Sequence, residues 1–187
     1  MEDKLKQAVE CLVSCFQQGG KLMVCGNGGS AADSAHITGE LVKGFRKKRP
    51  LSAELQAKIG DDWGEKLQQG LCTIDLTANA ALISAVANDI DGASVYAQQV
   101  TAYGSQGDVI IGISTSGNAE NVCRALTVAR ALGMTTIGMT GAGGGKMAGL
   151  CDILFNVPET ETYKVQEMHL PLYHQLCLGI EDAMFEE

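Results

Sequence analysis

Apolar residues along the chain alternate between short continuous runs and longer stretches at helical spacing. The continuous runs predict strands at residues 21–25, 71–75, 108–113, 135–139 and 153–157. Stretches with an apolar residue at every third or fourth position predict helices at residues 4–17, 78–88, 93–103, 119–132 and 163–184. This alternation predicts a single-domain α/β fold in which helices flank a parallel sheet.

Two segments interrupt the pattern. Residues 46–69 are polar and charged, and we interpret them as an excursion from the fold with a short helix beginning at Ala53. Pro171 lies within the last predicted helix, where it must either kink the helix or delimit its first turn.

The strand at residues 21–25 ends in a glycine-rich turn, GNGGS, that contains the candidate ligand residues Asn27, Gly28 and Ser30. Glycine permits positive φ, so successive amides can point into one concavity, as a phosphate requires. Ser30 is also predicted to cap the next helix, with Asp33 completing a capping-box-like pattern. A dinucleotide fingerprint fits the turn loosely, but the next predicted strand comes too late to supply the acidic residue expected about 20 residues on. A phosphate cradle is therefore favoured.

His36 and Glu40 lie four residues apart in the helix that follows this turn. Both side chains project from one helix face, so the pair could bind a metal or move protons. Taken alone, it could equally be an exposed pair that contributes only about 0.3 kcal/mol.

A second hydroxyl-rich turn, STSGN, follows the strand at residues 108–113. Its candidate ligand residues are Ser114, Thr115, Ser116 and Asn118. One hydroxyl would satisfy an ordinary helix cap, so three hydroxyls and a glycine favour a second anion cradle. Both cradles follow the carboxyl ends of strands, where parallel sheets bind ligands. Four glycines within residues 141–145 are interpreted as a flexible turn rather than a ligand loop.

The last predicted helix carries Gln166, His169 and His174. Gln166 and His174 project within about 80° of each other on a regular helix, whereas His169 points elsewhere. A single histidine of this kind is more often a satisfied core or surface residue than a functional one.

Composition indicates which classes of partner the protein can bind and which cellular compartment it occupies. The net charge is −8 and basic residues cluster only at residues 46–49 (RKKR), which argues against nucleic acid and indicates a solvated loop. Seven scattered cysteines without a C-x-x-C pair indicate a reducing compartment, so we expect a cytoplasmic protein. We expect no membrane partner, because no apolar run approaches the roughly 20 residues of a membrane span.

The chain resembles the sugar isomerase (SIS) family, and within it the phosphoheptose isomerases. The resemblance rests on motifs that occur together and in order: GNGGSAADSAH, Glu40, NDI at 88–90, GDVIIGISTSGN, GGKMAG and QEMH. It covers nearly the whole chain apart from residues 46–69. The resemblance implies a doubly wound sheet of five parallel strands and a homotetramer with active sites at subunit interfaces.

The resemblance also implies roles for individual residues. Glu40 and His174 fall on catalytic positions. The sugar phosphate would be bound by Asn27, Gly28, Ser30, Asp89, Ser114, Thr115, Ser116, Asn118 and Gln166. Where a member carries zinc, the matching ligands are His36, Glu40, Gln166 and His174.

Three positions depart from the family pattern. Ala119 stands where a serine is usual, Gly44 replaces an arginine four residues after Glu40, and Tyr163 replaces an aspartate found in some members. Arg46 lies close to the missing arginine in sequence. These departures affect contacts with the sugar more than the reaction chemistry.

The leading hypothesis is an aldose–ketose isomerase that converts sedoheptulose 7-phosphate to D-glycero-D-manno-heptose 7-phosphate through a cis-enediol. Glu40 would act as the base and His174 would exchange protons with the substrate oxygens. Metal-assisted and purely acid–base mechanisms both fit these residues. Two alternatives are a non-catalytic phosphosugar-binding protein, like relatives that dock on a replication initiator, and an isomerase or lyase for an amino-sugar phosphate.

Overall fold

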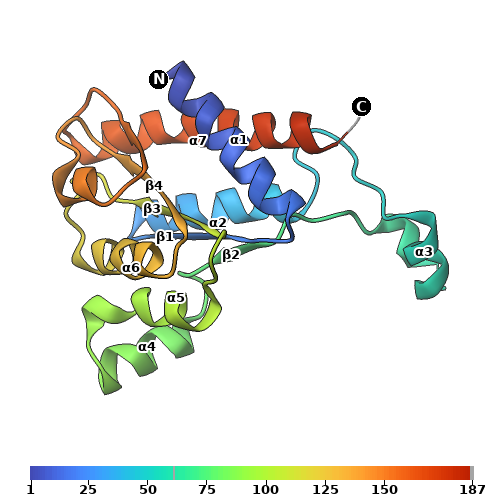
Figure 1. Cartoon of the computed structure of the whole chain (residues 1–187), viewed down its shortest axis with the longest axis horizontal. Helices are drawn as coiled ribbons and strands as arrows, with labels where there is room; N and C mark the ends of the chain where they lie inside the picture. The colour runs from blue at the N-terminus through green and yellow to red at the C-terminus, as the bar shows by residue number, and fades with distance from the viewer. Residues whose placement is uncertain (61, 186–187) are drawn as a thin grey trace.

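The computed structural model describes residues 1–60 and 62–185 of the chain. Within this part, one sheet of five parallel strands forms the centre of the molecule (Figure 1). Its strands, in spatial order, are β2 (Thr73–Asp75), β1 (Leu22–Gly26), β3 (Val109–Ile113), β4 (Thr135–Thr140) and β5 (Ile153–Asn156). The chain leaves β1 toward β2 and then returns to the other side of β1, so the switch point lies between β1 and β3. The doubly wound parallel sheet that we predicted is confirmed.

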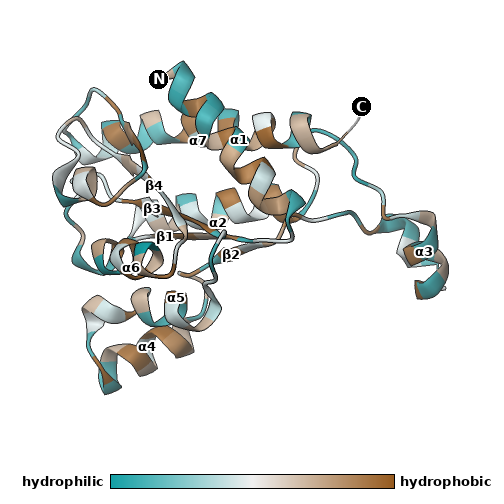
Figure 2. Ribbon diagram, in the orientation of Figure 1, coloured by the Kyte–Doolittle hydropathy of each residue, from teal (hydrophilic) through white to brown (hydrophobic). Residues whose placement is uncertain are grey.

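Helices cover both faces of the sheet (Figure 1). One face packs against α1 (Glu2–Gln17), α2 (Gly29–Val42) and α7 (Thr162–Met184), and the other against α4 (Ala80–Asp89), α5 (Ala97–Tyr103) and α6 (Glu120–Ala131). Successive strand side chains alternate between the faces. Leu22 and Val24 therefore join the first core, whereas Met23 and Cys25 join the second. The strands are accordingly among the most apolar segments in Figure 2, because both of their faces are buried.

One segment projects from this layered body (Figure 1). It contains α3 (Ala53–Ile59) and the 3₁₀ helix η1 (Asp62–Lys66). The hydroxyl of Ser52 accepts a hydrogen bond from the backbone N–H of Leu55 and caps α3, so the helix predicted to begin at Ala53 is confirmed. None of the described residues of α3 is buried.

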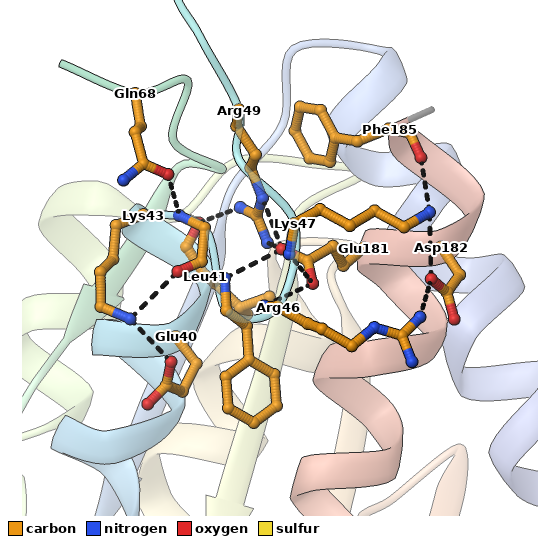
Figure 3. A network of polar contacts seen from close by, with 12 residues as sticks. Glu40, Leu41, Lys43, Arg46, Lys47, Arg49, Gln68, Glu181, Asp182 and Phe185 are labelled. Atoms are coloured by element: carbon orange, nitrogen blue, oxygen red, sulfur yellow. Dashed lines mark hydrogen bonds and ion pairs between the residues drawn. The ribbon is translucent and has the colours of Figure 1, made fainter. Parts of the chain in front are cut away.

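The basic run at residues 46–49 was predicted to be a solvated loop, which is wrong for Arg49 but holds for the exposed Arg46 and Lys48. Arg49 and Glu181 are both fully buried, with 2.8 Å between Arg49 Nη2 and Glu181 Oε1. Glu181 also accepts hydrogen bonds from the backbone N–H groups of Phe45, Arg46 and Lys47 (Figure 3). Burial raises the pKa of the Glu181 carboxyl, but these hydrogen bonds outweigh it and the net pKa is lowered. The carboxylate therefore fastens the loop to α7.

Two expectations about helix ends are also corrected. Helix α2 begins at Gly29 after Gly28, which has a φ of 58°, so Ser30 lies inside the helix and no side chain caps it. Helix α7 continues through Pro171, which therefore does not delimit its first turn.

The single helix predicted at residues 93–103 is instead two elements. A 3₁₀ turn, η2 (Gly92–Ser94), precedes α5, and Asp91 caps η2 by accepting a hydrogen bond from Ala93 N. A further 3₁₀ helix, η3 (Gly145–Gly149), follows the glycine-rich turn after β4.

Candidate active site

A pocket of about 340 Å³ lies beyond the carboxyl ends of β1 and β3, at the switch point of the sheet. The two strands are neighbours, with Gly26 paired to Ile113, so the turns that follow them lie side by side. The pocket is lined by Asn27, Gly28, Gly29, Ser30, Ile113, Ser114, Thr115, Ser116, Ala119, Thr162 and Gln166. Both predicted cradles therefore contribute to one pocket.

The pocket contains neutral hydrogen-bond donors. No lysine or arginine is among the described residues that line it, and the helices α2 and α6 both begin beside it. Free N–H groups at a helix N-terminus attract anions, and hydroxyl groups add further donors. The hydroxyl of Thr115 makes no hydrogen bond within the described part of the chain, whereas Ser116 Oγ accepts one from Asn118 N at 3.2 Å. Thr115, like Ser30 and Thr162 of the same pocket, therefore has a hydroxyl available to a ligand.

Asn118 does not line the pocket; it supports the second turn from behind. Its side chain donates to the Ser116 carbonyl and accepts from Lys146 N, each with 2.9–3.0 Å between the heavy atoms. A Cβ on Gly117, which has a φ of 67°, would lie only 2.1 Å from the Gly144 carbonyl oxygen. The glycine-rich turn therefore packs directly against the second cradle, which explains its glycines without a ligand contact.

Asn27 is tied to two other elements. It forms a reciprocal pair of side-chain amide hydrogen bonds with Asn121 of α6, both at 2.9 Å. The buried Tyr96 hydroxyl donates to the Gly26 carbonyl at 2.6 Å and lies 3.2 Å from Asn27 Oδ1. These contacts hold the first cradle in place.

Gln166 reaches the pocket from the first turns of α7. A Cβ added to Gly29 would lie 2.4 Å from Gln166 Nε2, so the glycine is what allows this close approach. Gln166, predicted as a substrate-binding and metal-binding residue, therefore lines the pocket beside the first turn.

His36 and Glu40 are placed together on α2, as the spacing predicted. His36 Nε2 lies 3.2 Å from Glu40 Oε1, and Lys43 Nζ lies 2.9 Å from Glu40 Oε2. Figure 3 shows Glu40 and Lys43 at the end of α2 that faces α7. The Glu40 side chain is only 16% exposed.

His174 joins this pair from α7. Its ring centroid lies 5.1 Å from that of His36 and 5.5 Å from that of Phe45. His174 Nε2 is buried and has no hydrogen-bond partner among the described residues. Even so, no three His, Cys, Asp or Glu side chains in the described ranges converge as a metal site requires.

Sequence reasoning missed one member of this cluster, Tyr173. Its hydroxyl lies 2.9 Å from His36 Nδ1 and 3.3 Å from Asp33 Oδ1. Asp33, predicted as part of a capping box, is thus engaged with α7 instead. The only signal in the sequence was the position of Tyr173 directly before His174.

Three other predicted residues lie outside the cluster. His169 is buried in the core and its Nε2 contacts the Thr140 carbonyl at 3.3 Å, so it points away from the site, as expected. Asp89 is exposed at the end of α4 and does not line the pocket. Arg46, close in sequence to the missing arginine, is directed toward α7, where its guanidinium pairs with Asp182 at 2.6 Å (Figure 3).

This fold and pocket define a doubly wound α/β domain with a hydroxyl- and amide-lined pocket at its switch point and titratable side chains on the helices beside it. The family model described as the SIS domain matches residues 1–66 and 66–141. A phosphoheptose isomerase from Nitratidesulfovibrio vulgaris is 41% identical over 184 residues, which are 98% of this chain and 79% of that protein. The chain therefore belongs to the SIS domain family and, within it, to the phosphoheptose isomerases.

Solved structures give the same result. A phosphoheptose isomerase from Neisseria gonorrhoeae superposes with a TM-score of 0.80 at 35% identity, covering 96% of this chain and 85% of that one. One from Francisella tularensis has a TM-score of 0.81 at 33% identity, covering 95% and 85% of the two chains.

Proposed function

We propose that this protein is an aldose–ketose isomerase that converts sedoheptulose 7-phosphate to D-glycero-D-manno-heptose 7-phosphate through a cis-enediol. One observation carries the proposal: α2 and α7 both begin at the phosphate pocket, and both carry reactive side chains two to three turns further on. The relatives named phosphoheptose isomerase support the same reaction.

The helical spacing matches a substrate of this length. Ser30 and His36 are about 9 Å apart along α2, at 1.5 Å per residue. A seven-carbon chain ending in a phosphate ester spans about 10 Å when extended, at the roughly 1.2 Å per bond of an extended backbone. A sugar anchored by its phosphate in the pocket would therefore place its carbonyl end beside His36, whose Nε2 lies 3.2 Å from Glu40 Oε1.

The reaction needs one proton removed beside the carbonyl and one returned at the neighbouring carbon. Glu40 is the base in this proposal; Lys43 pairs with its Oε2, and its Oε1 lies 3.2 Å from His36 Nε2. His174 exchanges protons with the two substrate oxygens, and its Nε2 is unpartnered among the described residues. Binding of the phosphate at the far end holds the sugar in a reactive pose.

Zinc belongs to the proposal as the cofactor. Its ligands would be His36, Glu40, Gln166 and His174. Imidazole and carboxylate groups are ordinary zinc ligands, and the buried, unpartnered His174 Nε2 supports a cation here. When bound, the ion polarises the substrate carbonyl.

We further propose a cytoplasmic homotetramer with active sites at subunit interfaces. Apolar surface supports the assembly: α4 is largely apolar yet buries few residues, and Ile90 and Leu170 are exposed (Figure 2). All seven cysteines are free, which supports a reducing compartment. The part of the chain that the structure describes contains no helix of the length and apolarity that would cross a membrane.

The test is isomerase turnover on sedoheptulose 7-phosphate, measured on the protein as isolated, after chelation and with zinc restored. Glu40→Gln and His174→Ala should each lower kcat by about 100-fold or more, because general acid–base catalysis is worth that much. Lys48→Ala, an exposed change outside the site, is the matched control and should keep full turnover. Full turnover in both site variants would overturn the assignment.

The same assay separates the alternatives. A non-catalytic phosphosugar-binding protein would bind sedoheptulose 7-phosphate in a titration yet show no turnover in any metal state. An enzyme for an amino-sugar phosphate would turn over that substrate only. The joint placement of Glu40 and His174 beside the pocket favours the isomerase.

A further inference from the structure

The first cradle is a short turn made almost entirely of glycine. Between Gly26 and Ser30, Asn27 is the only residue that has a side chain. A glycine-rich turn has many accessible backbone conformations when nothing restrains it, so a ligand that had to order the turn would bind more weakly. Any pairing of side chains that restrains the turn must therefore be made with Asn27.

Asn121 makes that pairing from α6. Each of the two side-chain amides donates to the Oδ1 of the other, with 2.9 Å between the heavy atoms. Asn121 is the second residue of α6, the helix that follows the second cradle, and the next residue, Val122, is fully buried in the core. The reciprocal pair therefore connects the first cradle to the packed helix that follows the second.

Tyr96 restrains the start of the same turn. It directly precedes α5 and is 5% exposed. Its hydroxyl has one proton and lies 2.6 Å from the Gly26 carbonyl oxygen and 3.2 Å from Asn27 Oδ1, so the shorter contact is the main hydrogen bond. Burial raises the pKa of the Tyr96 hydroxyl to about 12, so the hydroxyl stays a donor. Two elements thus hold two successive residues of the turn.

Both restraints act from outside the pocket. Asn27 lines the pocket, whereas Asn121 and Tyr96 are not among the described residues that do. The pair of Asn27 and Asn121 is exposed to solvent, so water can replace its hydrogen bonds when one partner is removed. Loss of the pair should therefore affect the ligand more than the stability of the fold.

We propose that Asn121 and Tyr96 are positioning residues that hold the first cradle, through Asn27 and the Gly26 carbonyl, in its phosphate-binding conformation before the ligand arrives. This deepens the proposed function and rests on it in one respect, which is that the ligand of the pocket is a phosphate. Neither residue touches the substrate in this proposal.

The test is a double-mutant cycle with inorganic phosphate as the probe. An NMR titration of the backbone amide signals measures the dissociation constant of phosphate for the parent protein, Asn121→Ala, Asn27→Ala and the double variant. We expect Asn121→Ala to weaken phosphate binding by about 5- to 10-fold, which corresponds to roughly one hydrogen bond. Because Asn121 acts only through Asn27, the double variant should bind phosphate no more weakly than Asn27→Ala alone.

Turnover gives a second readout. In Asn121→Ala the KM for sedoheptulose 7-phosphate should rise by a similar factor, while kcat changes by less than about twofold, because the ground state and the transition state share the phosphate contact. Gln98→Ala is the matched control, since it removes the amide of an exposed residue on α5 outside the pocket and should leave both constants unchanged.

Tyr96→Phe tests the proposal by a second route if Asn121→Ala fails to fold. It keeps the buried ring and removes only the hydroxyl that holds the Gly26 carbonyl. Phosphate binding should again weaken by about 5- to 10-fold.

An unchanged phosphate affinity in a folded Asn121→Ala variant, or in Tyr96→Phe where Asn121→Ala does not fold, would overturn the proposal. Additive losses in the cycle would also overturn it, because Asn121 would then act by a route other than Asn27. If phosphate binding shows the expected coupling but the parent protein does not isomerise sedoheptulose 7-phosphate, the reaction assignment fails and the positioning role stands. A parent protein that binds no phosphate would overturn both.

Discussion

Two regions of the molecule collect hydrogen-bond donors around a negative group, and they do so by opposite means. The phosphate pocket uses hydroxyls, amides and the starts of α2 and α6, with no lysine or arginine among its described lining residues. The loop at residues 45–49 has the only cluster of basic side chains, and it is directed at the carboxylates of Glu181 and Asp182 (Figure 3).

In this protein the loop's basic residues hold the fold together, whereas under the proposed function neutral groups would recognise the substrate phosphate. The Glu181 carboxylate is a fixed part of the fold and needs a fixed counter-charge. The Arg49 guanidinium supplies it, and both side chains are fully buried. A substrate phosphate must enter and leave, and preorganised neutral dipoles bind it without leaving an unpaired buried cation afterwards. Three predictions test this contrast, in order of decreasing expected effect.

Removing the Glu181 carboxylate should cause the largest change. Glu181→Ala leaves the buried Arg49 guanidinium without its counter-charge and leaves three backbone N–H groups without an acceptor. We expect the free energy of unfolding to fall by about 3–5 kcal/mol, measured by urea denaturation. The neighbouring Asp182→Ala is the control and should have a much smaller effect, since its side chain is 47% exposed. Equal effects of the two variants would contradict the assignment of Glu181 as the anchor.

Removing one neutral donor from the pocket should affect binding rather than folding. Thr115→Val keeps the shape of the side chain and deletes a hydroxyl that has no partner within the described residues. A hydrogen bond to a charged group is worth about 1.5–3 kcal/mol, so kcat/KM should fall by about 10- to 100-fold with little change in stability. Lys48→Ala should leave kcat/KM unchanged; the idea that neutral donors bind the phosphate fails if Lys48→Ala is the more damaging variant.

The strands and the two cradles of the pocket could be predicted from the sequence. Each strand appeared as an apolar run, and the two cradles followed strands that proved to be neighbours. Glycines and hydroxyl residues directly after a strand are explained by the local turn that they form. They can therefore be recognised without knowing the fold. His36 and Glu40 were predictable for the same reason, because helical spacing alone puts them on one face.

Features that depend on distant pairs could not be predicted. Arg49 pairs with Glu181, 132 positions later, so this one member of a basic run that is usually solvated is buried. Tyr173 is an ordinary apolar helix position until α2 brings Asp33 and His36 against it. The need for glycine in residues 141–145 follows from the close packing of this turn against the second cradle, which only the fold reveals.

His169 offers the smallest and most specific test, because it is a buried ionisable group kept neutral, in contrast to Glu181, which is kept charged. Burial lowers the pKa of His169 below its ordinary value near 6.5, and the Thr140 carbonyl only partly offsets this. As the pH falls below about 6.5, the unfolded chain binds a proton at this residue while the folded protein does not. The free energy of unfolding should therefore decrease on acidification, with a slope of at most about 1.4 kcal/mol per pH unit from this one proton.

His169→Gln should remove that part of the slope, although its stability at neutral pH will also be lower. Urea denaturation of both proteins between pH 5 and 7.5 measures the difference, and the histidines common to both, His36 and His174, cancel from it. Parallel pH dependences for the two proteins would mean that His169 takes up its proton in the folded state. The core around Thr140 would then have to accommodate a positive charge. In that case the hydrogen bonds around Glu181 would not be what allows a buried group to stay charged in this protein.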